Sequence, residues 1–330
     1  MIRMLIAFLF FALNGYAQKP FGTIAFWNVE NLFDTIDDPA INDAEFLPGG
    51  KNKWTAERYK TKLNRLSKVI LAMNTGRGPD LLGLAEVENY QVLCDLTTCM
   101  PLKRKKYGIV HYDSPDRRGI DVALIYKKDR FTVLGSKPIS LSTSKDTFYT
   151  RDILLVKGVL RGKDTLYIFV NHWPSRRGGQ AASEPKRMLA ARVLRKAQDS
   201  ILRMNPRAQM LAMGDFNDEP TDKSVRLLHE AEDIPGGFIN LMDSLKAAGD
   251  GSYHYRKEKN MLDQILVTRS LLDQRHLYVS RKPSIVKFDW TTGQNYKNDD
   301  PGPLHTYAGS FYIGGYSDHY PVMVTIYFAP

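Results

Sequence analysis

The chain has 330 residues, of which 43% are hydrophobic, so it is long enough to bury a sizeable core in one large domain or two. Lysine and arginine number 46 against 36 aspartate and glutamate residues, which gives a formal net charge of +10. This charge favours an anionic partner such as nucleic acid, a phosphorylated sugar or a membrane surface, although a basic surface kept for solubility gives the same total. No linker, repeat or low-complexity tract interrupts the sequence.

The first residues have the features of an export signal. Arg3 precedes an apolar run over residues 4–13, and the small residues Gly15 and Ala17 follow. The run is shorter than the roughly 20 apolar residues that cross a bilayer, so an uncleaved anchor is the less favoured alternative. We expect a signal peptide over residues 1–17, export to the periplasm or the medium, and a single domain over residues 18–330. We also expect a monomer without stable membrane insertion.

Apolar, strand-like runs alternate with helical patterns along the chain. Apolar residues at helical spacing predict a helix capped by Thr55 and ending near Gly76, and another beginning at Ser183 with Pro185 just inside. Strands are predicted at residues 21–29, 80–87, 121–126, 151–160, 165–172, 209–216, 262–268 and 319–328. Residues 290–316 are expected to form a long functional loop. The mixture predicts an α/β (or α+β) protein with one mixed sheet or two sheets.

The two cysteines, Cys94 and Cys99, are close in sequence. Export would allow a disulfide between them, and two structural thiols are the alternative. A single Cys-x4-Cys pair without a matching second pair does not favour a zinc site.

Acids, amides and imidazoles stand at the ends of six predicted strands. They are Asn28, Glu86, His172, Asp215 with Asn217, Asp263, and Asp318 with His319. In α/β folds ligand sites gather at strand ends. Oxygen ligands such as Glu86 and Asp318 suit Mg²⁺, Ca²⁺ or Mn²⁺ rather than zinc. Because histidines beside such an ion can neutralise charge on a phosphoryl group, this set predicts metal-assisted hydrolysis of a phosphate ester by water.

Six short motifs carry these residues in a fixed order. They are Trp27-Asn28-Val29-Glu30-Asn31, Ala85-Glu86-Val87, Asn171-His172-Trp173, Gly214-Asp215-Phe216-Asn217, Leu262-Asp263 and Ser317-Asp318-His319-Tyr320-Pro321-Val322. The chain thereby resembles the endonuclease/exonuclease/phosphatase family, which includes pancreatic-type deoxyribonucleases, apurinic/apyrimidinic endonucleases, inositol-polyphosphate phosphatases and bacterial sphingomyelinases. The resemblance implies a four-layer α/β/β/α sandwich, in which two mixed sheets are flanked by helices.

The resemblance also implies a metal site. Glu86 would be the principal ligand of a Mg²⁺ ion, with Asn28 and Asp318 beside it, and Mn²⁺ or Ca²⁺ are alternatives. Some family members have aspartate where this chain has Glu30, so a second metal contact there stays open. His319 would contact the scissile phosphate or act as general base, oriented by Asp263.

Further roles follow from the same resemblance. Asp215 would position or deprotonate the attacking water, or protonate the leaving group, and Asn217 would hold Asp215 or a phosphate oxygen. His172 would donate to a phosphate oxygen, with Asp121 as the candidate acid that supports it. Arg151 matches a phosphate-contacting arginine of deoxyribonuclease-like members.

Three classes of function remain open. A low-specificity nuclease acting on DNA or RNA is favoured by the basic segments 103–106, 116–119 (with Arg118) and 175–178, which could meet backbone phosphates. The alternative enzyme is a phosphatase or phosphodiesterase on a small or lipid-linked phosphate, such as an inositol phosphate or a sphingomyelin-like lipid. For it, a tyrosine-rich loop (Tyr296, Tyr307, Tyr312, Tyr316) would shape the pocket. A non-enzymatic nucleic-acid-binding module is the third.

Overall fold

The computed structural model describes residues 20–142, 149–162, 164–229, 236–296 and 300–329. The predicted signal peptide over residues 1–17 lies outside them. None of the helices within the described ranges is both long and apolar enough to cross a membrane.

The first sheet (sheet A) has the first and last long strands of the chain at its centre. In spatial order it contains β13 (Leu277–Val279), β19 (Val322–Phe328), β1 (Gly22–Leu32), β2 (Leu81–Val87), β4 (Asp121–Lys127) and β3 (Tyr107–His111), with β14 (Ser284–Ile285) also paired to β19. β1 runs parallel to β2 and antiparallel to β19, and the remaining pairs are antiparallel.

The second sheet (sheet B) is also mixed. Its order is β5 (Phe131–Ile139), β6 (Ile153–Leu160), β7 (Asp164–His172), β8 (Gln209–Asp215), β12 (Asp263–Val267) and β9 (Ile239–Asn240). Only the central pair, β7 and β8, is parallel. Because β1–β2 and β7–β8 are parallel pairs near the middle of each sheet, the ends of four central strands can meet at one edge of the molecule.

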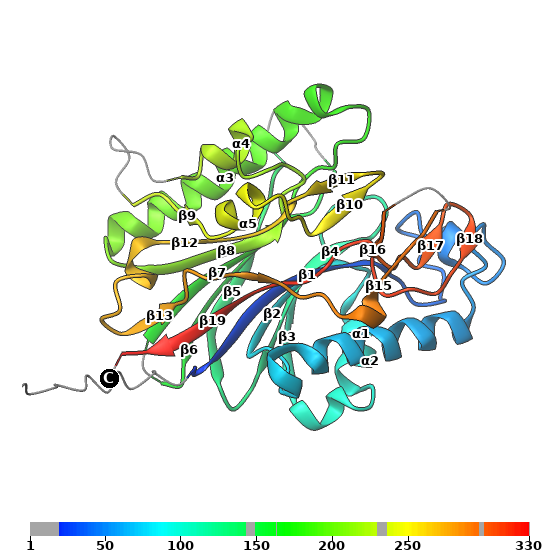
Figure 1. Cartoon of the computed structure of the whole chain (residues 1–330), viewed down its shortest axis with the longest axis horizontal. Coiled ribbons are helices and arrows are strands. Elements are labelled where there is room, and N and C mark those ends of the chain that lie inside the picture. The colour runs from blue at the N-terminus through cyan, green and yellow to red at the C-terminus, as the bar shows by residue number, and fades with distance from the viewer. Residues whose placement is uncertain (1–19, 143–148, 163, 230–235, 297–299, 330) are drawn as a thin grey trace, which may run out of the picture.

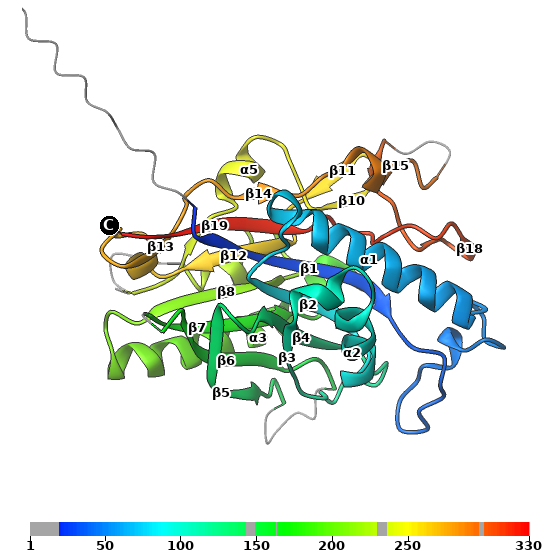
Figure 2. The same ribbon diagram turned by 90° about the horizontal axis from the view of Figure 1, so that it is seen from below.

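Helices cover the two outer faces, as Figures 1 and 2 show. α1 (Ala56–Gly76) and α2 (Tyr90–Thr98) pack on sheet A, and α3 (Gln180–Met204), with the short α4 (Lys223–Arg226), packs on sheet B. A third core lies between the sheets, where Phe26 of β1 meets side chains of sheet B such as Met213. These layers confirm the predicted four-layer α/β/β/α sandwich.

Both predicted long helices form, and one starts earlier than expected. Thr55 caps α1 by accepting a hydrogen bond from the amide of Arg58. α3 begins at Gln180 rather than at Ser183, and the Ser183 hydroxyl donates to the carbonyl of Gly179 inside the first turn. A serine that can bond either an amide or a carbonyl marks a helix start only approximately.

Several smaller elements depart from the prediction. The last strand begins at Val322 instead of residue 319, so the acid and imidazole that precede it lie on the loop entering the strand. β3, β5 and α2 were not predicted. Short hairpins stand at β10 (Tyr253–Tyr255) with β11 (Glu258–Asn260), β15 (Thr292–Gly293) with β16 (Gly302–Pro303), and β17 (Tyr307–Ala308) with β18 (Phe311–Tyr312), and a short helix α5 spans Asp243–Ala247. Both cysteines are free thiols.

Candidate active site

The ends of strands from both sheets, with the loop that enters β19, bring seven predicted side chains together. Asn28 of β1 pairs in register with the residue before Glu86 on β2, while His172 of β7 and Asp263 of β12 both pair with Asp215 of β8. Asn28, His172, Asp215, Asp263 and His319 are buried, whereas Glu86 and Asp318 keep 16% and 27% of their side chains exposed. The two exposed carboxylates are therefore the ones that an ion or a substrate can reach.

His319 is held by a carboxylate from the opposite sheet. Its Nδ1 donates to Asp263 Oδ2 at 2.6 Å, and its backbone carbonyl accepts a hydrogen bond from the indole of Trp27. The hydroxyl of Ser252 also donates to Asp263 Oδ2. Burial alone would lower the pKa of His319, but the negative charges of Asp263 and Asp318 outweigh it and hold that pKa well above its usual value. His319 is therefore an imidazolium whose Nε2 is left for another partner.

Asp215 lies between the two histidines. Its Oδ2 is 3.9 Å from Nε2 of His319, 3.6 Å from Nε2 of His172, and accepts a hydrogen bond from the Asn28 amide at 3.1 Å. The backbone amide of Asn217 donates to the other oxygen. Burial raises the pKa of Asp215 to about 7, with the positive charge of His319 acting in the opposite sense. A carboxyl group with this pKa can take up and release a proton near neutral pH.

Glu86 owes its orientation to an irregular strand end. The pairing of β2 with β4 shifts between Ala85 and Val87, and Glu86 has a left-handed backbone with φ 63°. Its two carboxylate oxygens accept hydrogen bonds from the Asn28 side chain and from the amide of Asn31. Strained backbone of this kind persists where the surroundings fix it, and here the β-bulge turns the side chain into the site.

The donor set fits a hard divalent cation. Glu86 and Asp318 offer partly exposed carboxylate oxygens, and the Asn28 carbonyl oxygen, which accepts the amide of Glu30, keeps a second lone pair. Oxygen-only ligation of this sort suits Mg²⁺, Mn²⁺ or Ca²⁺. Within the described residues two groups of acids and histidine also lie close enough to share an ion, and one of them is Asp215, Asp263 and His319.

His172 lies on the cationic side of the site, without the acid predicted to support it. Its pKa is held well below the usual value by burial, by Arg151 and by Arg118, so the ring is neutral. Asp121 instead binds His111, whose Nε2 is 3.0 Å from Asp121 Oδ2. Because β3 pairs with β4, Asp121 at the start of β4 lies within reach of His111 on β3 and not of His172. Among the described residues no hydrogen-bond partner is found for Nδ1 of His172.

Arg151 also differs from its predicted place. Its guanidinium is buried and donates to Asp116 Oδ2 at 3.0 Å and to the carbonyl of Trp173 at 2.6 Å. It therefore ties the loop at residues 116–119 to the segment after His172 instead of presenting a free fork to a phosphate. Arg118, from the same loop, keeps 47% of its side chain exposed and is the one of these two arginines that a ligand can reach.

Asn217 forms hydrogen bonds to other residues of the protein around the site. Its backbone is left-handed, with φ 50°, its amide donates to Asp215, and its side chain donates to the carbonyl of Trp173 at 3.0 Å. These contacts agree with its predicted hold on Asp215. The basic run 103–106 lies far from the site. It comes just before Tyr107, the first residue of β3, which pairs with Lys127 of β4. The residue before Lys127, Tyr126, pairs with Leu81 at the start of β2. That end of sheet A lies about 17 Å from Glu86, at 3.3 Å per residue.

A family comparison matches almost the whole described part of the chain. The model of the endonuclease/exonuclease/phosphatase family matches residues 23–327. The chain belongs to this family. A search of curated proteins gave no match.

Solved structures of family members share the fold at low sequence identity. The human Nocturnin catalytic domain with bound sulfate is 19% identical, with a TM-score of 0.57 over 93% of this chain and 94% of that one. A mannosyl-6-phosphatase from Bacteroides thetaiotaomicron is 15% identical, with a TM-score of 0.56 over 93% and 99%. A humanized D. rerio TDP2 is 18% identical, with a TM-score of 0.55 over 92% and 97%. At these identities the likeness establishes the fold alone.

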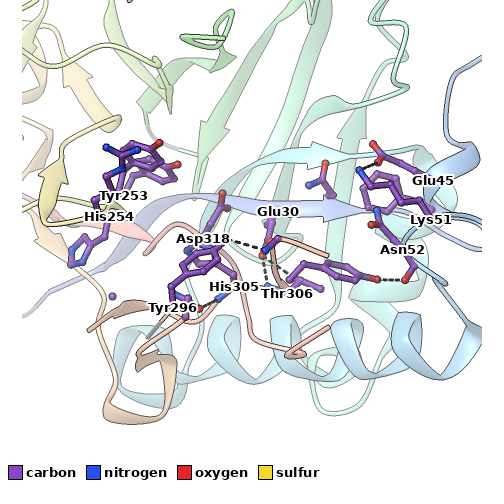
Figure 3. Close-up of a pocket in the computed structure, with 18 of the residues that line it drawn as sticks. Glu30, Glu45, Lys51, Asn52, Tyr253, His254, Tyr296, His305, Thr306 and Asp318 are labelled. Atoms are coloured by element: carbon purple, nitrogen blue, oxygen red, sulfur yellow. Dashed lines mark hydrogen bonds and ion pairs between the residues drawn. The ribbon is translucent and has the colours of Figure 1, made fainter. Parts of the chain in front are cut away.

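This family member has a polar pocket of about 650 Å³ next to Asp318 (Figure 3). Two of the four tyrosines of the late loop, Tyr296 and Tyr307, line it, together with Tyr253 from the β10–β11 hairpin. The other two, Tyr312 and Tyr316, instead pack beneath Arg58 and Arg65 of α1 as cation–π partners. The tyrosine-rich loop thus both lines a pocket and fastens itself to a helix.

Two residues beside the site carried no sequence signal. Ser252, which orients Asp263, stands in an ordinary Gly-Ser-Tyr turn, and Lys62, which approaches Glu30, looks like any polar residue of an amphipathic helix. Both act through tertiary contacts with segments far away in the chain. A serine or lysine of this kind is recognised only once its distant partner is placed.

Proposed function

We propose that this protein is an exported, divalent-metal-dependent hydrolase of phosphate esters, with Mg²⁺ as its ion. One observation carries the proposal most strongly: a charged His319–Asp263 pair faces Asp215 and the exposed carboxylate of Asp318. Glu86, Asp318 and Asn28 would hold the ion. When bound, such an ion polarises a phosphoryl oxygen and lowers the pKa of a water molecule.

The residues of the chain would then divide the remaining work. Asp215, with a pKa of about 7, would accept the proton of the attacking water. His319, held as an imidazolium by Asp263, would donate a hydrogen bond to a phosphoryl oxygen and offset its developing charge. Neutral His172, 3.6 Å from Asp215, would donate a second such bond.

We propose phosphodiester bonds of nucleic acid as the first substrate class. Arg118, with 47% of its side chain exposed, and Arg176, which is 26% exposed and ion-paired to Asp222, flank the His172 side of the site. Cations at these positions would bind the phosphates on either side of the scissile bond without reading bases, so low sequence specificity follows.

A small phosphate ester is the second candidate, favoured by the pocket next to Asp318. Its lining mixes tyrosines with amides such as Asn52 and with acids such as Glu45, and it has few cations, among them Lys51. A neutral polar group suits this lining better than a polyanionic strand. A mannosyl-6-phosphatase is among the proteins that share the fold.

A substrate panel with matched variants tests both candidates. Linear DNA, circular DNA, RNA, sugar phosphates and an inositol phosphate are each incubated with Mg²⁺ or with a chelator. If the protein is a nuclease, we expect Arg118→Gln to raise KM for DNA and to leave the other reactions unchanged. Tyr253→Phe is then expected to leave DNA cleavage unchanged. If the protein acts on small phosphate esters, we expect Tyr253→Phe to raise KM for the ester and Arg118→Gln to leave its hydrolysis unchanged. Failure to hydrolyse any of them with metal present would refute the proposed function.

A further inference from the structure

A buried lysine lies beside the proposed metal site. Lys62, on α1, has 1% of its side chain exposed. Its ammonium donates to the Thr306 hydroxyl at 2.6 Å and to the carbonyl of Tyr316 at 2.8 Å, and lies 3.8 Å from Glu30 Oε2. A buried ammonium is strongly destabilising unless it is paired and hydrogen-bonded, so these contacts account for its presence there.

Glu30 is turned toward this lysine by its own backbone. Its φ is 52°, within the irregular part of β1 between Asn28 and Leu32, and its amide donates to the Asn28 side chain. The carboxylate oxygen Oε2 accepts hydrogen bonds from the amide of Thr306 at 2.7 Å and from its hydroxyl at 2.8 Å. Figure 3 shows Glu30 directed at Thr306.

The three acids of this region therefore have different surroundings. Oε2 of Glu30 is used by Thr306 and Lys62, and the residue is buried. Glu86 and Asp318 keep exposed carboxylate surface. Lys62 and Glu30 form a pair whose summed charge is zero, whichever of the two holds the proton between them. The carboxylates of Glu86 and Asp318 then leave a net charge of minus two, the complement of a single divalent ion.

We propose that Lys62 withholds Glu30 from metal coordination, so that the site binds one divalent ion, at Glu86 and Asp318. Lys62 is a positioning residue: it neutralises Glu30 and clamps the segment from Thr306 to Tyr316 that leads to Asp318. The inference rests on the proposed function, because it concerns the ion of that same site.

Counting bound Mn²⁺ by electron paramagnetic resonance and by calorimetry tests the proposal without measuring turnover. The wild-type protein is expected to bind one tight ion per chain. Glu86→Gln is expected to weaken its binding about tenfold or more, while Glu30→Gln leaves the Kd near the wild-type value. Glu45→Gln, which alters an exposed acid of the neighbouring pocket, is the matched control.

The outcomes separate the inference from the proposed function. Two tight ions in the wild type, one of them lost in Glu30→Gln, would overturn the inference while metal-dependent hydrolysis stands. No bound ion at all would overturn both. A fall in affinity in Glu30→Gln equal to that in Glu86→Gln would also refute the role of Lys62.

A double-mutant cycle tests the clamp itself. Lys62→Met leaves the Glu30 carboxylate buried without its cation, so the melting temperature of the metal-free protein is expected to fall. Lys62→Met with Glu30→Gln is expected to recover much of that loss, because no charge is then left unpaired. Purely additive effects would show that the two charges do not interact. If the single lysine variant does not fold, the Mn²⁺ count of Glu30→Gln still decides the inference.

Discussion

At the scale of single residues, the contact between His319 and Asp263 orients the candidate catalytic imidazole. We expect Asp263→Asn to lower kcat by about 10²–10⁴-fold, because the amide fixes neither the tautomer nor the charge of the ring. Turnover of the best substrate and the melting temperature are measured together. Asp113→Asn is the matched control, since that carboxylate lies 3.9 Å from another histidine, His111, and is largely exposed. Wild-type turnover in the Asp263 variant would contradict the assignment.

The pKa of Asp215 has a consequence for stability in the absence of metal. In the folded chain this pKa is about 7, above the ordinary 3.8 of an aspartate in the unfolded chain. Between these pH values the folded state holds a proton that the unfolded state has lost, so the contribution of Asp215 to stability falls as pH rises from about 4 to 7. Asp215→Asn lacks this dependence.

Melting curves of both proteins in chelator, from pH 4 to pH 8, measure this difference. We expect the variant to gain stability relative to the wild type across that window and the gap to level off above about pH 7. The pKa shifts of groups that do not interact with Asp215 cancel in the comparison. A gap that does not change with pH would show that Asp215 ionises normally in the fold.

Sequence alone located most of these residues but not their partners. Asn28, Glu86, Asp215 and His319 stand in short motifs at strand ends, so pattern and family resemblance reach them. The partner of Asp121 depends on β3 pairing with β4, which sets His111 opposite Ala123 and within reach of Asp121, and nothing in the local sequence specifies this pairing. The same holds for Ser252, whose contact with Asp263 was found only in the folded chain.

At the scale of elements, β7 and β8 approach each other closely beneath the site. A Cβ at Gly214 would lie 2.4 Å from the backbone carbonyl oxygen of Asn171, which is far inside contact distance. We expect Gly214→Ala to push the strands apart, to lower the melting temperature and to reduce kcat by displacing the adjacent Asp215 from His172. Gly135→Ala, on the edge strand β5 with nothing within 4 Å of its Cβ, is the control. Equal stability and activity in both variants would contradict the argument.

Elements with strong periodic patterns were predictable, and edge elements were not. α1 has its cap and its apolar stripe where the sequence indicates, although its backbone leaves the helical conformation at Met73, slightly before the predicted end near Gly76. β5 lies at the edge of sheet B with most of its residues exposed and carries Pro138 and an irregular pairing at Gly135, so it lacks the alternation of a half-buried strand. The hairpins of the late loop are too short for any pattern to emerge.

At the scale of the whole molecule, the two sheets share one core. Met213 of β8 is fully buried, and a Cβ at Gly83 of β2 would lie 2.8 Å from its methyl carbon. We expect denaturant to unfold the protein in a single transition, and Met213→Ala to lower its free energy of unfolding by about 2–5 kcal/mol without splitting that transition. Met204→Ala, at a side chain that is 76% exposed, serves as control. Two separate transitions would show that the sheets are independent units.

The four-layer architecture could not be predicted from the periodicity of apolar residues alone. Strand and helix patterns predicted a mixed α/β protein and left one sheet or two undecided. The choice between one sheet and two depends on which strands pair across long stretches of chain, such as β1 with β19. The four layers were therefore predicted only from the resemblance of the motifs to the family. Local sequence does not encode such pairings.

The position of β19 beside β1 sets the order in which this protein can become active during synthesis. Asp318 and His319 lie just before the last long strand, while Asn28 belongs to the first. When both helical layers and every other acid of the site have left the ribosome, β19 is still missing from the centre of sheet A. The imidazole held by Asp263 is missing as well. Such a fold is dominated by distant contacts and forms slowly. The site therefore stays incomplete until the segment that carries Asp318, His319 and β19 has left the ribosome.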